Sequence, residues 1–102
     1  QRGEADKAVE VFTKALKWDP NFVQATASLA AAHFMLGNLD QSIALSERAL
    51  KQEPGFGPAY NNLALAWLEK GDGKKALEYA NLAASNGFDV PEEFWKELEP
   101  YK

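Results

Sequence analysis

Few side chains in this 102-residue sequence have the types and spacings needed for chemistry. The single histidine, His33, has no second histidine and no cysteine in the sequence to complete a metal site or a catalytic pair. Ser42 and Ser46 fall within one predicted helix and have no base paired with them, so neither is a candidate nucleophile. We expect His33 to be a partly buried packing residue with one hydrogen bond, rather than a ligand or a base.

Two glycine-containing stretches resemble ligand-binding loops only superficially. The stretch "GDGKK", residues 71–75, does not match G-x-x-x-x-G-K-[ST], in which backbone amides hold phosphates. The stretch "GFG", residues 55–57, is more simply a turn between helices. Carboxylates are numerous, but no pair is identifiable as an acid and a base. The sequence therefore predicts no catalytic residue, no metal site, no cofactor and no enzymatic activity.

Composition and charge restrict the class of protein. With 46% hydrophobic and 25% charged residues, the chain has a globular balance. The net charge of −4, without a block of like charges, disfavours nucleic-acid binding. No apolar run approaches the length of a membrane span, and no targeting segment is recognisable. The sequence does not determine the cellular compartment and slightly favours the cytoplasm. Because the sequence opens within an apparent helix, we expect a fragment of a longer protein.

Residue size repeats along the chain with a period of 34 residues. Gly3, Gly37 and Gly71 share this spacing. The same spacing relates small residues to small ones and large residues to large ones: Ala8, Ser42 and Ala76; Ala15, Ala49 and Ala83; Val9, Ile43 and Leu77; Leu29 and Leu63; and Pro20 and Pro54. A period of this length is typical of stacked helix pairs that bury their faces against neighbouring pairs.

Each period is predicted to contain two helices joined by a short turn. The expected helices span residues 4–18, 23–36, 39–52, 58–70, 74–85 and about 91–101. Gly37 suits the left-handed position after a helix, and Asn38 with Gln41 suits the start of the next one. Asp89 and Glu92 have capping-box spacing for the last helix. The predicted single domain divides into residues 1–22, the second helix of a truncated repeat, two repeats at 23–56 and 57–90, and a capping helix at 91–102.

Small residues at regular points let the helix axes approach closely. We expect these close contacts at Ala30, Ser42, Ala49, Ala64, Ala76 and Ala83. Trp18 and Trp67 fall at positions where large residues would fill the core. At the N-terminal end, Val9, Phe12 and Leu16 should be partly exposed, on a face that either upstream residues or a second copy of the chain covers.

The sequence resembles the tetratricopeptide repeat family. Matches to the 34-residue motif include "KALKWDPN" at residues 14–21, Leu29 with Ala30 in the second repeat, and Tyr60 with Trp67 in the third. Phe88 stands where the motif has proline. The resemblance implies an all-α, right-handed superhelical solenoid of antiparallel helix pairs with a C-terminal capping helix. It also implies a noncatalytic scaffold for protein–protein interaction.

The resemblance further implies a peptide-binding groove on the concave face, lined by the first helix of each repeat. The positions that map there are Gln24, Ala27, Ala31, Phe34, Met35, Asn61, Asn62, Leu65, Leu68, Glu69 and, in the capping helix, Trp95; Pro58 maps to the same surface. Such a mixture of apolar residues and amides suits a peptide backbone with apolar side chains. The alternatives are that Phe34 and Leu68 pack on the next repeat, that Asn62 bonds a loop carbonyl, and that Trp95 lies flat on the third repeat.

The partner is expected to be a protein or peptide, without nucleic acid or membrane insertion. Members of the family that hold a C-terminal carboxylate use lysine and arginine at positions where this chain has Ala27, Ala31, Pro58 and Asn62. Because only the amide is present, a neutral or basic segment is favoured over an acidic C-terminal tail. The alternatives are self-assembly through the ends of the stack, including a homo-oligomer through the N-terminal helix, or regulation of an enzyme elsewhere in a larger protein.

Overall fold

The computed structural model describes residues 2–102 and shows an all-helical chain. Within these residues there are six α-helices and no strand. They are α1 (Arg2–Trp18), α2 (Val23–Met35), α3 (Leu39–Gln52), α4 (Gly57–Glu69), α5 (Gly73–Ser85) and α6 (Glu92–Leu98), followed by the 3-10 turn η1 (Glu99–Tyr101). The helices agree with the predicted ranges to within a few residues, except that α6 gives way to a tighter turn after Leu98.

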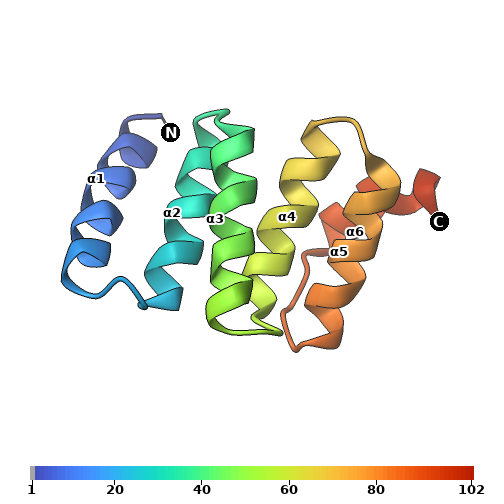
Figure 1. Ribbon diagram of the computed structural model, residues 1–102. Coiled ribbons are helices and arrows are strands. Elements are labelled where there is room, and N and C mark those ends of the chain that lie inside the picture. Colours follow the sequence, from blue (N-terminus) through green and yellow to red (C-terminus); the bar gives the residue numbers. More distant parts are fainter. Residues whose placement is uncertain (1) are drawn as a thin grey trace.

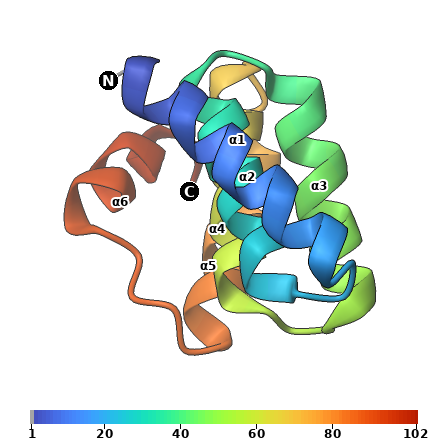
Figure 2. The same cartoon turned by 90° about the vertical axis from the view of Figure 1, so that its left-hand side faces the viewer.

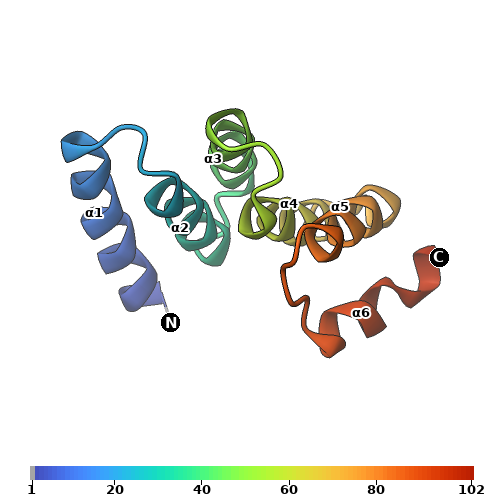
Figure 3. The same cartoon turned by 90° about the horizontal axis from the view of Figure 1, so that it is seen from below.

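The helices stack side by side in chain order, which gives an elongated body of 41 × 29 × 20 Å (Figure 1). Each helix from α1 to α5 packs on the next, and α2 also packs on α4. Seen from below, α1 and α6 lie at opposite ends of the stack, with α2 and α4 between them (Figure 3). The first helices of the two complete repeats are therefore neighbours, although 34 residues separate their equivalent positions. None of the helices described is long and apolar enough to cross a membrane.

The helices pack closely at small side chains, as the sequence predicts. The six small residues expected at close contacts are each 0% exposed: Ala30, Ser42, Ala49, Ala64, Ala76 and Ala83. Larger side chains fill the spaces between these contacts, and Leu63 is among the largest that are fully buried. A larger side chain at any of the six positions would have to push two helices apart.

Glycines in the left-handed conformation end three of the helices. Gly37, Gly71 and Gly87 have φ values of +81°, +94° and +88°, a region that costs little only for glycine. At the start of α5, the Asp72 carboxylate accepts a hydrogen bond of 3.0 Å from the backbone amide of Lys75. Asn38 occupies the equivalent position before α3 but makes no capping bond.

The two side-chain caps predicted for α3 and α6 are wrong. The Asn38 side chain lies 3.2 Å from the ring Nδ1 of His33 and is therefore engaged away from the amides of α3. The N-cap of α6 is Pro91, with no side-chain capping bond, rather than Asp89. Because Val90 is only 6% exposed and anchors the chain on the core, the helix begins after it, and Asp89 is too far upstream to cap.

The last segment covers the C-terminal end of the stack. Val90, Phe94 and Leu98 join the buried cluster formed by α4 and α5, and their exposed fractions are 6% or less. The Tyr101 ring lies against Gly73, where an added Cβ would come within 2.3 Å of a ring carbon. The segment therefore shields apolar surface that a further repeat would otherwise bury.

Trp67 and Trp18, both predicted to lie in the core, differ in burial. Trp67 is half-buried against the C-terminal cluster. Trp18 is 90% exposed, so the prediction for it is wrong. The physical reason is that α1 packs on α2 alone, and no described element lies on the side of α1 where Trp18 projects.

Candidate functional site

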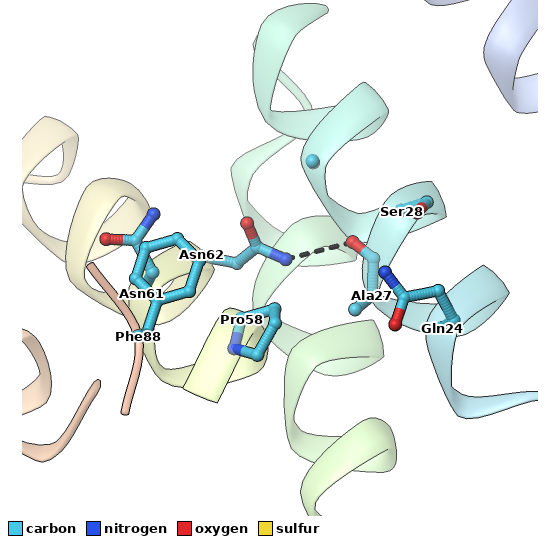
Figure 4. Close-up of a pocket in the computed structure, with 8 residues that line it drawn as sticks. Gln24, Ala27, Ser28, Pro58, Asn61, Asn62 and Phe88 are labelled. Carbon is cyan, nitrogen blue, oxygen red and sulfur yellow. Dashed lines mark hydrogen bonds between the residues drawn. The ribbon is translucent and has the colours of Figure 1, made fainter. Parts of the chain in front are cut away.

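The facing sides of α2 and α4 leave a shallow hollow of about 130 Å³ between the repeats. It is lined by Gln24, Ala27, Ser28, Ala31, Pro58, Asn61, Asn62 and Phe88. The small residues on α2 create the space, because no large side chain projects from that helix toward α4 at these positions. Five of the predicted groove residues meet here, together with Pro58 (Figure 4).

Asn62 forms a bridge between the two helices that make this hollow. Its Nδ2 donates a hydrogen bond of 2.9 Å to the backbone carbonyl of Ala27, and the residue is 7% exposed. The alternative in which Asn62 bonds a loop carbonyl is wrong, because the acceptor belongs to helix α2. The amide therefore has a structural partner before any ligand arrives.

Asn61 and Phe88 form the other wall of the hollow. Figure 4 shows the Phe88 ring beside the Asn61 side chain. The Oδ1 atom of Asn61 is buried and has no hydrogen-bond partner among the described residues. An amide with an unsatisfied oxygen retains a capacity to accept a hydrogen bond if the wall around it shifts.

Sequence reasoning did not predict Phe88 as a lining residue. The backbone amide of Phe88 donates to the Ala83 carbonyl at 3.0 Å, which directs the α5–α6 connection across the start of α4. There the absence of a side chain at Gly57 makes room, since an added Cβ would lie 2.9 Å from the Cβ of Phe88. The only available signal was that Phe88 stands in a position where the repeat motif has proline.

A second, larger hollow of about 410 Å³ lies where α2 ends near the end of α4. Its lining residues are Phe34, Met35, Gly37, Leu39 and Glu69. Met35 is 60% exposed and is one of six large apolar side chains that are exposed among the described residues. Glu69 supplies a carboxylate at the edge of this otherwise apolar surface.

The remaining three predicted groove residues pack against the C-terminal core. Leu65, Leu68 and Trp95 are half-buried against the cluster of α4, α5 and α6. For Trp95 this agrees with packing on the third repeat, an alternative that the sequence left open. Leu68 was expected, as an alternative, to pack on a next repeat, but the cluster that it contacts comes from its own repeat and the segment that follows. Phe34, which was also considered as a packing residue, lines the second hollow.

The charged and titratable groups near the site are few. None of the residues that line the two hollows is a lysine or an arginine, and Glu69 is the one acidic member. His33 is half-buried, and its Nδ1 lies 3.2 Å from Asn38, in agreement with the expected packing role. Among residues 2–102, no group of three or more histidine, aspartate or glutamate side chains is placed to hold a metal ion.

Two family models match overlapping parts of the chain. Models described as tetratricopeptide repeat match residues 1–45 and residues 36–89. The chain belongs to the tetratricopeptide repeat family. Repeats of this family are generally noncatalytic modules, and the fold supports a scaffold for protein–protein interaction. No curated protein sequence matches the chain.

Solved structures of tetratricopeptide repeat domains have the same arrangement of helices. The chain is 24% identical to the TPR2B domain of yeast Sti1 in complex with pHsp70, with a TM-score of 0.78. The match covers 97% of this chain and 80% of the Sti1 chain. Two structures of MamA, one of them described as MamA MSR-1 C2, are also 24% identical, with TM-scores of 0.71 and 0.72. The match covers 92% and 81% of this chain, which thus spans about half the length of the MamA chains (52% and 48%). At this identity the likeness establishes the fold.

Proposed function

We propose that the chain binds a peptide or protein segment in the concave groove formed by α2 and α4. The observation that carries this proposal is the coincidence of the two hollows with the predicted groove. Eight of the eleven predicted residues line one hollow or the other. The Sti1 domain with the same fold is described in complex with pHsp70, which supports a peptide as the kind of ligand.

The chemistry of the surface favours a segment with apolar side chains and a neutral or basic character. Met35, with Phe34 and Leu39, offers an adaptable apolar surface in the larger hollow. The Glu69 carboxylate lies beside these residues and can pair with a lysine or an arginine of the ligand. An acidic C-terminal tail would meet no lysine or arginine among the lining residues and would approach Glu69.

The proposal can be tested by selecting peptides from a random displayed library on the intact chain. The selected peptides are then titrated against Ala31→Trp, which fills the first hollow, and against Ala44→Trp, which adds the same side chain at an exposed position of α3. We expect Ala31→Trp to weaken binding by at least about tenfold and Ala44→Trp to leave it within about twofold. Failure to select any peptide, or equal effects of the two variants, would refute groove binding.

The expected charge preference has its own measurement. The selected peptides should be enriched in lysine and arginine next to apolar residues, and their affinity should fall when salt is added. Glu69→Gln should remove part of that salt dependence, whereas Glu47→Gln, at an exposed position of α3, should not. Selection of peptides with acidic C-terminal tails would contradict the charge preference while leaving groove binding intact.

A further inference from the structure

The two hollows between the repeats lie on one continuous stripe of each helix. The residues of α2 that line them follow one another at helical intervals along one side of the helix: Gln24, Ala27, Ser28, Ala31, Phe34 and Met35. On α4 the lining residues are Pro58, Asn61, Asn62 and Glu69, which also share one side. Figure 1 shows α2 and α4 running in the same direction. One ligand segment can therefore contact both hollows along the seam between α2 and α4.

The distance between the hollows sets the length of ligand that reaches both. On α2 the middle of the first set of lining residues precedes the middle of the second by about seven residues, which is about 10 Å of helix at about 1.5 Å per residue. An extended peptide advances about 3.3 Å per residue, so it covers this distance in about three or four residues. The ligand side chains that enter the two hollows are then separated by that number of positions.

The first hollow contains polar side chains that are not used inside the chain. The side chains of Gln24 and Ser28 make no hydrogen bond to any other residue that the structure describes. Figure 4 shows Gln24 and Asn61 on opposite sides of the hollow. The Oδ1 atom of Asn61 is buried and has no partner among residues 2–102. Only Asn62 of the polar lining residues is already bonded, to the Ala27 carbonyl.

The Asn61 oxygen determines which kind of group would complete the hollow. A carboxamide oxygen only accepts, so it requires an N–H or O–H donor. An apolar side chain would leave this oxygen unpaired and would displace water from Gln24 and Ser28 without replacing its hydrogen bonds. A charged side chain would lose its hydration where none of the lining residues is charged. An uncharged group with both a donor and an acceptor fits best.

The size of the first hollow indicates a side chain rather than a small molecule. Its volume is about 130 Å³, whereas pockets that hold drug-sized ligands enclose about 300–1,000 Å³. Phe88 forms one wall and is half-buried. Figure 2 shows α6 and the connection that leads to it, which carries Phe88, on the side of the stack opposite α3.

We propose that the first hollow binds the side chain of an asparagine or glutamine of the ligand, while an apolar side chain about three or four residues away enters the second hollow. The amide N–H donates to Asn61 Oδ1 when the Phe88 ring beside it turns aside, and the amide also exchanges hydrogen bonds with Gln24 or Ser28. The apolar side chain contacts Met35. This inference rests on the proposed binding of a peptide in the groove, and adds the identity, spacing and direction of the ligand's contacts.

Peptides selected on the intact chain from the random displayed library test the amide subsite. Asparagine or glutamine should recur about three or four residues from a leucine, isoleucine, phenylalanine or methionine. In one such peptide, replacing asparagine by leucine, or glutamine by methionine, should weaken binding by at least about tenfold in calorimetric titration. Peptides that bind without any amide preference would overturn the subsite and leave groove binding intact. Selection of no peptide at all would refute both.

A double-mutant cycle assigns the peptide amide to Asn61. In Asn61→Ala the loss caused by removing the peptide amide should shrink to within about threefold, because the acceptor is absent. Asn81→Ala removes the same side chain from an exposed position of α5 and should leave the tenfold discrimination unchanged. Circular dichroism checks that both variants are folded. Discrimination that survives in Asn61→Ala would overturn the assignment.

Insertion of residues tests the arrangement along the seam. Two alanines placed between the amide and the apolar residue lengthen an extended peptide by about 7 Å and should weaken binding by at least about tenfold. The same two alanines at one end of the peptide should leave binding within about twofold. Met35→Ala should remove the preference for a large apolar residue, whereas Leu82→Ala, at another exposed apolar position, should not. Unchanged affinity after the internal insertion, or equal effects of the two alanine variants, would overturn this arrangement.

Discussion

Replacing Asn62 by alanine should lower the free energy of unfolding by about 1 kcal/mol. The side chain is 7% exposed and donates one hydrogen bond, to the Ala27 carbonyl across the boundary between two repeats. A buried hydrogen bond of this kind contributes about 0.5–1.5 kcal/mol net. The Ala27 carbonyl lies inside α2 and keeps its place in the helical hydrogen-bond pattern, so no large penalty for an unpaired group is added.

The neighbouring Asn61→Ala is a closely matched control. It removes the same atoms from the adjacent residue, but the Asn61 Oδ1 is buried without a partner, so its loss should leave stability unchanged or raise it slightly. Urea unfolding followed by circular dichroism measures both variants. A loss of 1 kcal/mol corresponds to a fall in Tm of about 4–8 °C for a domain of this size. The reasoning is refuted if Asn62→Ala is as stable as the wild type, or if Asn61→Ala loses as much.

Three further outcomes follow from the packing and from the helix ends. Ala83→Leu should lower the free energy of unfolding by about 1–3 kcal/mol, because the side chain at this position is 0% exposed between helices. An unchanged Tm in a thermal melt would contradict this close packing. Asp72→Ala should lower the free energy of unfolding by about 1 kcal/mol, because it removes the cap of α5. Asn38→Ala should lower it by less than about 0.5 kcal/mol, because Asn38 makes no capping bond. Denaturant titration compares the two variants, and equal losses would contradict this difference between the caps. Burial, followed by the charges of Glu47 and Glu78, raises the pKa of Tyr79 above its ordinary value of 10.0, so the folded state retains the phenol proton more strongly than the unfolded chain. Stability should therefore be intact below pH 10 and fall as the pH rises beyond it, and Tyr79→Phe should flatten this decline in unfolding titrations; an unchanged slope would contradict the assignment.

The sequence alone was sufficient to predict the stack of helix pairs and the points at which the helices touch. Side-chain size at Ala30, Ala49 and Ala64 repeats with the period of the structural unit, and close helix packing requires small residues at those places whatever else surrounds them. Gly37 and Gly71 likewise mark turns, because the left-handed backbone there is favourable only for glycine. Residue type and spacing are therefore sufficient to predict local constraints of this kind.

The site depended on contacts between residues that are far apart in the chain. Asn62 and Ala27 are 35 residues apart in the sequence, and they meet only because α2 and α4 pack against each other. No local pattern in the sequence encodes that contact. Phe88 reaches the groove because the α5–α6 connection crosses the start of α4 at Gly57. The exposure of Trp18 has the same origin: burial depends on the neighbours a residue has in space, and the period of the sequence predicts the surface of a helix without supplying the helix that covers it.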